Sequence, residues 1–455
     1  MSAPDGIEAV AVRARDAALS AGAGDAEAFV EDSSGVEIRV YDGEVESLSE
    51  SAARGVGLRA WLDGRTGYAY GTDLGDAGIG EVAAGAVETA RISDPDEFAG
   101  PPDLKAAAMP TIAGIHDPSL AQWATEQKVE LAQGIERACR ATDERVAAIE
   151  QTVYADEEER VAIASSGGLE GAYASTTCYA YLQAIAGEDS ERETGLGFGV
   201  ARAPSGLDPE AIGVEAAERA TSLLGATKPR SRTCPVVLDE TVAASFMGFI
   251  GGVLCADAVQ RGRSPFAGRL GDEIAAPALT LADDGTDPEG PASAPFDGEG
   301  TPRSRTPLIE AGALRTYLHD AYTARRGGEQ TTGNAARAGY RSAPSVSTSN
   351  LVISPGDASL DDLLADAEGG IYVTDVAGLH SGVNPVSGTF SVGASGREIS
   401  GGALAAPHTE FTIASDLVSM LAAVRAAARE TRWVPFGGSV KSTALLIGEM
   451  AVGGS

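Results

Sequence analysis

Histidine is scarce in this sequence, with four among 455 residues. The four lie far apart along the chain: His116, His319, His380 and His408. A zinc site needs three or four ligands that converge on one point. The four cysteines, Cys139, Cys178, Cys234 and Cys255, show no CxxC or other metal spacing. A metal site could arise only if folding brought distant residues together, and each histidine is better explained as a surface or hydrogen-bonded residue.

Lysine is equally scarce. Lys and Arg together number 34 against 66 Asp and Glu, so the net charge is −32. Such a charge causes self-repulsion that salt screens, because the Debye length falls to about 3 Å at 1 M. The composition indicates adaptation to a high-salt cytoplasm, as in a halophilic archaeon, although an acidic surface that serves ordinary solubility is the alternative. No basic stripe is present to neutralise phosphates, so nucleic acid is not an expected partner.

Long apolar runs are also missing. No run reaches the roughly 18 residues that cross a membrane. The start of the chain, MSAPDGIEAV, has neither the basic nor the apolar segment of a signal peptide. We therefore expect a cytoplasmic protein without a membrane partner. In that compartment the cysteines are expected to be reduced and mostly buried.

The first half of the sequence predicts helices and strands in an order that occurs twice. Helices are predicted over Gly6–Gly22, Ile79–Ile92, Ala121–Ala141 and Pro209–Leu224. The strands predicted between them are Ala28–Glu31, Val36–Val40, Gly57–Leu62, Gly67–Tyr70, Val146–Tyr154, Val161–Ser165, Leu169–Ala186 and Thr194–Ala201. The order helix, strands, helix thus occurs twice.

The rest of the chain is predicted to be rich in strands. A hairpin is expected around Ala311-Gly312, a buried strand over Gly370–Val376, and helices over Leu360–Ala367 and Ser415–Glu430. The fold class is therefore α+β: two N-terminal α-β-α units followed by a β-rich C-terminal domain. The predicted boundaries are 1–92, a linker over 93–118, a central unit over 119–227, and 228–455.

The stretch from Cys234 to Phe266 is the most informative part of the chain. A short strand precedes Asp239, which offers N-cap chemistry, and apolar residues then recur at three- and four-residue steps. The other side of this predicted helix carries a stripe of small residues: Ser245, Gly248, Gly252 and Cys255. Small residues let another backbone approach closely, at a cost in helix propensity.

Several ordered segments resemble the TldD/PmbA family over nearly the whole chain. They are DGEVESLSES with the GVGLRAW hairpin, PFDGEGTPRSRTPLIEAGALRTYLHDAYTARR, IYVTDVAGLHSGVNPVSGTFSVGASG and TEFTIASDLVSMLAAV. The resemblance implies a two-subunit peptidase that acts on unfolded or extended peptides. In the TldD subunit, zinc is held by HExxxH on the helix that matches this one and by a cysteine near the C-terminus. This chain has neither, since the segment corresponding to the cysteine is PFGGSVKS.

The resemblance is therefore to the PmbA (TldE) branch, whose members do not hold the metal. It implies no catalytic residue and no cofactor in this chain, with zinc in a TldD-like partner that forms a heterodimer or higher assembly with it. The alternatives are an autonomous metallopeptidase with an unrecognised site and a homodimeric peptide-binding or scaffold protein. Other chemistries are excluded because no GxxxxGK[ST] phosphate loop and no GxSxG nucleophile elbow occurs.

What remains is a recognition role. The loop from His380 to Gly388 and the strand after it are candidates to receive an extended peptide or the partner subunit by strand addition. A structural turn is the equally weighted alternative. The candidate binding residues are Ser245, Gly248 and Gly252 on the helix, and Asn384 and Gly388 in the loop, because Asn and Gly tolerate turn dihedrals.

Overall fold

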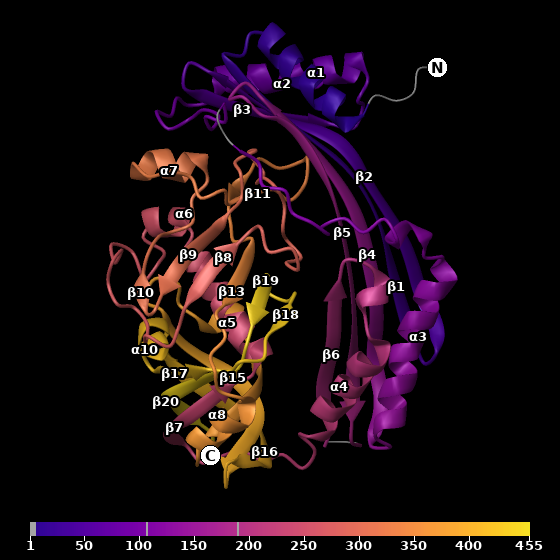
Figure 1. The fold of residues 1–455 in the computed structure, drawn as a ribbon, viewed down its shortest axis with the longest axis vertical. Coiled ribbons are helices and arrows are strands. Elements are labelled where there is room, and N and C mark those ends of the chain that lie inside the picture. Colours follow the sequence, from indigo (N-terminus) through magenta and orange to yellow (C-terminus); the bar gives the residue numbers. More distant parts are fainter. Residues whose placement is uncertain (1–5, 106–107, 189–190) are drawn as a thin grey trace.

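The structure is a computed structural model that describes residues 6–105, 108–188 and 191–455. Residues 1–5, at the start of MSAPDGIEAV, and residues 106 and 107, in the predicted linker, lie outside the described residues. Figure 1 shows long curved strands with helices at both ends, standing beside a β-rich half built from the C-terminal residues. The predicted α+β fold, with two N-terminal α-β-α units followed by a β-rich domain, is confirmed.

A single six-stranded antiparallel sheet runs through both N-terminal units. Its order is β3-β2-β1-β4-β5-β6, so β1 and β4 pair at its centre and join the two units. The strands are β1 (Asp25–Tyr41), β2 (Glu44–Leu62), β3 (Arg65–Gly71), β4 (Val146–Ser165), β5 (Glu170–Ala186) and β6 (Glu193–Ala201).

The central strands are longer than the sequence predicted. The polar residues Asp32–Gly35 and Asp156–Arg160 separate predicted strands, but they continue β1 and β4 without a break. Each of these two strands is paired on both edges, β1 with β2 and β4, and β4 with β1 and β5. Pairing on both edges outweighs the weak strand propensity of acidic and small residues.

The four N-terminal helices pack against the two ends of this sheet (Figure 1). Helices α1 (Ile7–Ser20) and α2 (Asp76–Ile92) share one hydrophobic core with β1 to β4. Helices α3 (Thr125–Thr142) and α4 (Pro209–Thr221) share a second core at the other end. The repeated order of helix, strands and helix is as predicted.

The C-terminal half contains two further six-stranded sheets. One has the order β10-β9-β8-β13-β19-β18, and the other has the order β16-β15-β14-β7-β20-β17, closed by pairing of β16 with β20. The strands of the first are β8 (Leu281–Asp284), β9 (Arg305–Glu310), β10 (Ala313–Leu314), β13 (Asn350–Ile353), β18 (Arg432–Val434) and β19 (Ser439–Ser442). Those of the second are β7 (Arg232–Leu238), β14 (Ile371–Ala377), β15 (Thr389–Ser400), β16 (Ala403–Asp416), β17 (Val424–Ala427) and β20 (Leu445–Gly453). A separate pair joins β11 (Ala335–Ala336) to β12 (Ser345–Val346).

The helices of this half are short apart from α5. They are α5 (Glu240–Val253), α6 (Ala256–Gln260), α7 (Ala321–Gly327), α8 (Leu360–Asp366), α9 (Leu379–Gly382) and α10 (Leu417–Ala422). The prediction of one helix over Ser415–Glu430 is wrong, because α10 ends at Ala422 and the chain continues as β17. Val424 there pairs with Ile447 of β20, so sheet pairing replaces the helix that the local apolar spacing favours.

None of the helices in the described ranges is long and apolar enough to cross a membrane. All four cysteines are buried and unpaired, as predicted.

Candidate functional site

Helix α5 is held between the two C-terminal sheets, where it contacts β13, β18 and β19 of one and β7 and β14 of the other. Asp239 caps it, since its carboxylate Oδ1 accepts a hydrogen bond from the backbone N–H of Val242 at 2.7 Å. Phe246 and Ile250 on the predicted apolar face are fully buried. The opposite side of the helix, which carries Ser245, Gly248 and Gly252, is less buried and is called here the open side of α5.

The small residues of α5 lie on that open side. A Cβ atom added to Gly248 would lie 2.6 Å from the carbonyl oxygen of Gly437, so two backbones approach closely there, as the glycine stripe predicted. Gly252 differs, because it is exposed and a Cβ atom there would have no described heavy atom within 4 Å. The expectation of tight packing along the stripe is therefore wrong at Gly252 within this chain. Ser245 is half-buried and bonds to the carbonyl of Thr241 in its own helix.

The backbone that meets Gly248 is the turn between β18 and β19. Gly437 and Gly438 in this turn have φ angles of +76° and +127°, in a region that favours glycine, and both are exposed. The turn belongs to PFGGSVKS, a segment that the sequence analysis singled out. That segment and helix α5, which the sequence also singled out, thus lie against each other here, with glycine on both sides.

The residues at this contact do not fit a zinc ion. Zinc is bound by thiolate, imidazole or carboxylate groups, and the facing positions Gly248 and Gly437 offer none. Within the described ranges, no group of three or more His, Cys, Asp or Glu residues is placed to hold a metal ion. Two of the histidines have separate partners within the fold. His408 lies 2.9 Å from the carbonyl oxygen of Thr227, and His116 lies 3.3 Å from the carboxylate of Glu158.

Glu240, the acidic residue at the start of α5, is held in ion pairs. Its carboxylate lies 3.3 Å from Arg432 and 3.5 Å from Arg219. Arg432 also pairs with Glu215 at 2.7 Å, and Arg219 pairs with the buried Asp239 at 2.8 Å. These ion pairs engage the Glu240 carboxylate with two side chains of its own chain.

Aromatic side chains connect this region to the N-terminal sheet. Phe436, just before the glycine turn, packs edge-on against Phe198 of β6 and Tyr181 of β5, with ring centroids 5.0 and 6.2 Å away. The guanidinium of Arg432 lies 4.0 Å from the centroid of the Phe198 ring. The open side of α5 therefore adjoins an aromatic contact between the two halves of the molecule.

The loop that contains Asn384 and Gly388 is a self-contained turn. The Asn384 side-chain oxygen accepts hydrogen bonds from the backbone N–H groups of Val386 and Ser387 at 2.9 and 3.2 Å. Gly388 has a φ of +76°, and its carbonyl oxygen accepts from the N–H of Leu417 at 2.9 Å, at the start of α10. The neighbours of Gly388 are Pro265 and Leu417, so the structure does not bring the loop candidates together with the small residues of α5.

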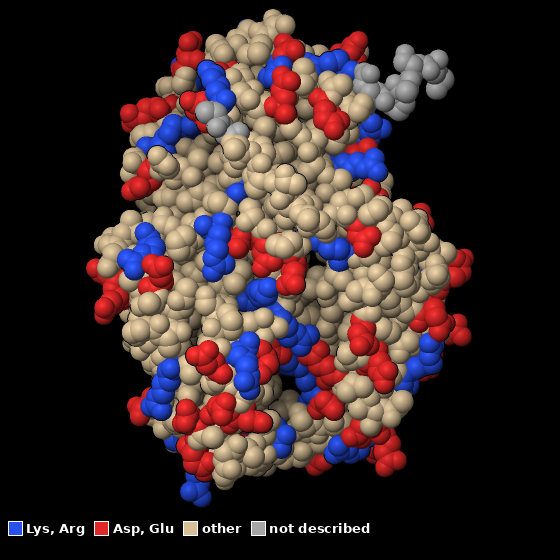
Figure 2. Space-filling view, viewed as in Figure 1, with Lys and Arg blue, Asp and Glu red and all other residues tan. Residues whose placement is uncertain are grey.

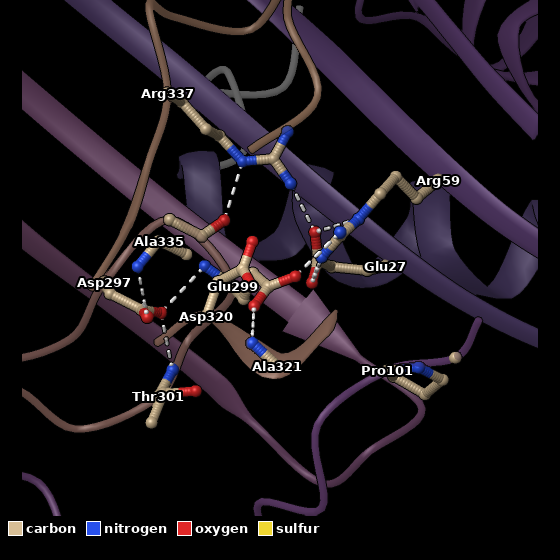
Figure 3. A network of polar contacts seen from close by, with 12 residues as sticks. Glu27, Arg59, Pro101, Asp297, Glu299, Thr301, Asp320, Ala321, Ala335 and Arg337 are labelled. Atoms are coloured by element: carbon tan, nitrogen blue, oxygen red, sulfur yellow. Dashed lines mark hydrogen bonds and ion pairs between the residues drawn. The ribbon is translucent and has the colours of Figure 1, made fainter. Parts of the chain in front are cut away.

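A buried ionic network joins the two halves at another point (Figure 3). Arg59 of β2 donates to Glu27 of β1 at 2.8 Å and to Glu299 of the C-terminal half at 2.8 Å. Arg337, also from the C-terminal half, donates to Glu27 from the other side. Burial alone would lower the pKa of Arg59, but the carboxylates of Glu27 and Glu299 raise it, so the guanidinium stays charged.

The segment that brings Glu299 into this network is itself fixed by Asp297. The Asp297 carboxylate accepts hydrogen bonds from the backbone N–H groups of Glu299, Thr301 and Ala335, each at 2.9 Å. The sequence prediction did not identify these residues as a unit. The available signal was PFDGEGTPRSR, a segment quoted for the resemblance, in which two acids and two glycines follow one another.

A cavity of about 210 Å³ lies between the halves, beside this network. Figure 2 shows the molecular face that is hollowed between the two halves, with acidic side chains over both. Phe29, Glu159 and Tyr173 of the N-terminal sheet and Arg303 of the C-terminal half are among the residues that line the cavity. Burial, followed by the charges of Glu157 and Glu31, raises the pKa of Glu159 to about 7.

This raised pKa predicts an unusual effect of Glu159→Gln. The carboxyl contributes stability fully below pH 4.5, its ordinary pKa, and loses that contribution as the pH rises through about 7. At pH 8 the substitution is therefore expected to raise the free energy of unfolding by about 1 to 3 kcal/mol. At pH 4.5 the gain should disappear. Thermal unfolding followed across this pH range measures both.

Glu158→Gln is the matched control on the same strand. The hydrogen bond from Arg160 lowers the pKa of Glu158, so its contribution is present at neutral pH and is lost as the pH falls. Replacing it should slightly destabilise the protein at pH 8. Equal effects of the two substitutions at pH 8 would show that burial does not raise the pKa of Glu159.

The chain is similar to known proteins over most of its length. Models of one family match in chain order: PmbA/TldA metallopeptidase domain 1 matches residues 26–90, the central domain matches 118–224, and the C-terminal domain matches 231–454. Metalloprotease PmbA from Escherichia coli O157:H7 is 29% identical over 406 residues, which cover 88% of this chain and 87% of that protein. A metalloprotease TldD homologue from Haemophilus influenzae is 27% identical over 440 residues, covering 91% and 89%.

A solved structure adds the fold. TldE from Thermococcus kodakarensis has a TM-score of 0.89 and 22% identity to this chain, and the match covers 98% of this chain and 100% of that one. The family models, the relatives and this fold all extend over both the N-terminal sheet and the β-rich half. The chain belongs to the PmbA/TldD family of metallopeptidase-like proteins, as its sequence motifs predicted.

Proposed function

We propose that this chain is the PmbA (TldE)-like, non-metal-binding subunit of a TldD/TldE-type metallopeptidase that cleaves unfolded or extended peptides. The observation that carries the proposal is the contact of Gly248 with Gly437, where two segments that hold zinc in TldD meet without a ligand. Peptide hydrolysis near neutral pH needs an activated water and a positioned general base. In this chain Glu240 is tied to Arg219 and Arg432, so it is not available as that base.

The proposal assigns zinc to a TldD-like partner subunit and no cofactor to this chain. The partner is expected to lie over the open side of α5, where Gly252 is exposed. The excess of acidic residues and the net charge of −32 support a salt-rich cytoplasm as its compartment and give no support to a nucleic-acid partner.

The test is reconstitution with a TldD-like chain from the same source. The isolated chain should hold far less than one equivalent of zinc by elemental analysis and should not cleave an unfolded peptide. The mixture should cleave it, and a chelator should abolish that cleavage. Changing any one of the four histidines of this chain to alanine should leave the reconstituted activity largely intact. Stoichiometric zinc in the isolated chain, or turnover that a single histidine change abolishes, would make this subunit the enzyme.

A further inference from the structure

The cavity between the two halves is lined by polar groups that the fold itself does not use. Glu159 of β4 and Tyr173 of β5 line it from the N-terminal sheet, and Arg303 lines it from the C-terminal half. In the ranges that the structure describes, neither the Glu159 carboxylate nor the Tyr173 hydroxyl has a hydrogen-bond partner. Polar groups away from bulk solvent are normally hydrogen-bonded, so these groups indicate that the cavity holds a further molecule.

The side chains around this cavity are fixed in position. The ring of Tyr173 packs edge-on against the buried Phe296, with ring centroids 5.1 Å apart. Arg303 donates from Nη1 to the carbonyl oxygen of Ala292 at 2.7 Å, and its stem lies against Gly285, where an added Cβ atom would be 2.6 Å from the Arg303 Cδ. A site whose side chains are already ordered loses little conformational freedom when it binds a ligand.

Arg303 keeps binding capacity after these contacts. Its Nε is buried and has no hydrogen-bond partner among the described residues, and the same part of the chain offers none to its Nη2. The other charged groups of the lining are engaged: Asp297 accepts three backbone hydrogen bonds, and Arg337 donates to the carbonyl of Gly298 at 2.6 Å and to Glu27. Glu159 and Arg303 are therefore the charges of the lining that remain for a ligand.

These two charges are opposite in sign but do not meet. No ion pair joins Glu159 to Arg303 within the described ranges, although the guanidinium is close enough to lower the pKa of the carboxyl. Glu157 on the same strand and Glu31 on β1 place further negative charge on the Glu159 side. The cavity thus favours a positive group at Glu159 and a negative group at Arg303.

The size of the cavity limits the ligand. Its volume of about 210 Å³ corresponds to roughly seven water molecules at about 30 Å³ each. It is smaller than the usual sites for drug-sized ligands, which begin at about 300 Å³. A molecule that carries both charges and fits this space is a compact zwitterion.

We propose that this cavity binds a free α-amino acid with a short side chain, its ammonium group at Glu159 and its carboxylate at Arg303. Burial raises the pKa of Tyr173, so its hydroxyl stays protonated and donates a hydrogen bond to the ligand carboxylate. The ligand bridges the two halves of the molecule. The described lining includes no residue of α5 or of PFGGSVKS, so this binding does not depend on the proposed peptidase role.

Calorimetric titration of the full-length chain with L-alanine tests the proposal. A single saturable site is expected, and it should persist in molar salt because buried charges are screened little. Ethylamine and propionate each carry one of the two charges on a molecule of similar size. Each leaves a charge of the cavity unpaired, so each should bind at least about tenfold more weakly than L-alanine.

Three variants locate the site. Glu159→Gln is expected to keep the fold and to weaken L-alanine binding by at least about tenfold, because it removes the partner of the ammonium group. Tyr173→Phe keeps the ring on Phe296 and should weaken binding less. Glu158→Gln is the matched control, since side chains alternate along a strand and Glu158 pairs with Arg160 instead. Its affinity should equal that of the unmodified chain.

Proton release gives a readout that is specific to Glu159. The groups that face its carboxyl are Glu157 and Glu31, which raise its pKa to about 7 together with burial, Arg303, which lowers it, and the neutral Tyr173. A bound ammonium group favours the ionised carboxylate, so binding at pH 7 should release a proton. The measured heat should then depend on the ionisation enthalpy of the buffer, and Glu159→Gln should abolish this dependence.

The same titrations separate a ligand from water and from a general solute effect. A cavity that holds water alone gives no saturable heat up to the solubility limit of L-alanine. Exclusion of the solute from the protein surface raises the melting temperature without saturation and equally in every variant. Either result, equal affinity of Glu159→Gln and the unmodified chain, or ethylamine binding as tightly as L-alanine would overturn the proposal.

Discussion

Glutamine in place of Glu27 is expected to lower the free energy of unfolding by about 3 to 5 kcal/mol. Glu27 is fully buried and is the carboxylate shared by Arg59 and Arg337. Removing its charge leaves Arg337 buried without a carboxylate partner among its described contacts, and such an uncompensated charge is strongly destabilising. Because these contacts join the two halves, chemical unfolding of the variant should also separate into two transitions.

The controls distinguish this network from ordinary surface pairs. Glu130→Gln removes an ion pair with Arg137 whose side chains are 66% and 60% exposed, so it should change stability by less than about 1 kcal/mol. Combining Glu27→Gln with Arg337→Met removes both charges and should recover part of the loss, since the unpaired guanidinium is then absent. A loss below 1 kcal/mol for Glu27→Gln alone would show that the network does not hold the halves together.

The local elements of the fold could be predicted because their signals are local. Asp239 before an apolar helical spacing identified α5, and the strands predicted over Gly57–Leu62 and Gly67–Tyr70 fall within β2 and β3. The continuity of β1 through Asp32–Gly35 could not be predicted, since it depends on pairing with β2 and β4. The end of α10 at Ala422 likewise depends on β20, which lies later in the chain.

In the candidate site, too, the sequence predicted local features but not the contacts between distant segments. The sequence singled out Gly248 and the Gly437-Gly438 segment separately, and the structure brings them into contact. No periodicity could connect Glu27 with Arg337, because they are distant in the chain and meet only where the halves pack. The different environments of Gly248 and Gly252 were also hidden, because both occupy the same stripe of one helix and only the position of the β18–β19 turn separates them.

Leucine at Gly248 and leucine at Gly252 are expected to change the free energy of unfolding in very different ways. In the isolated chain, Gly248→Leu should destabilise by about 1 to 3 kcal/mol, because its side chain would overlap the carbonyl of Gly437. Gly252→Leu has open space and should be neutral or should stabilise by up to about 1 kcal/mol through improved helix propensity. Thermal unfolding of the two variants measures this contrast.

When the TldD-like chain is added, we expect Gly252→Leu to impair peptide cleavage even though it does not destabilise the isolated chain. If the partner covers the open side of α5, the side chain of Gly252→Leu must project into the contact, and reconstituted peptide cleavage should fall by more than about tenfold, corresponding to about 1.4 kcal/mol of lost association. Because this variant retains its fold, the loss would be one of assembly, visible as reduced co-purification with the partner. Full cleavage and full co-purification by Gly252→Leu would instead place the partner on another surface of this subunit.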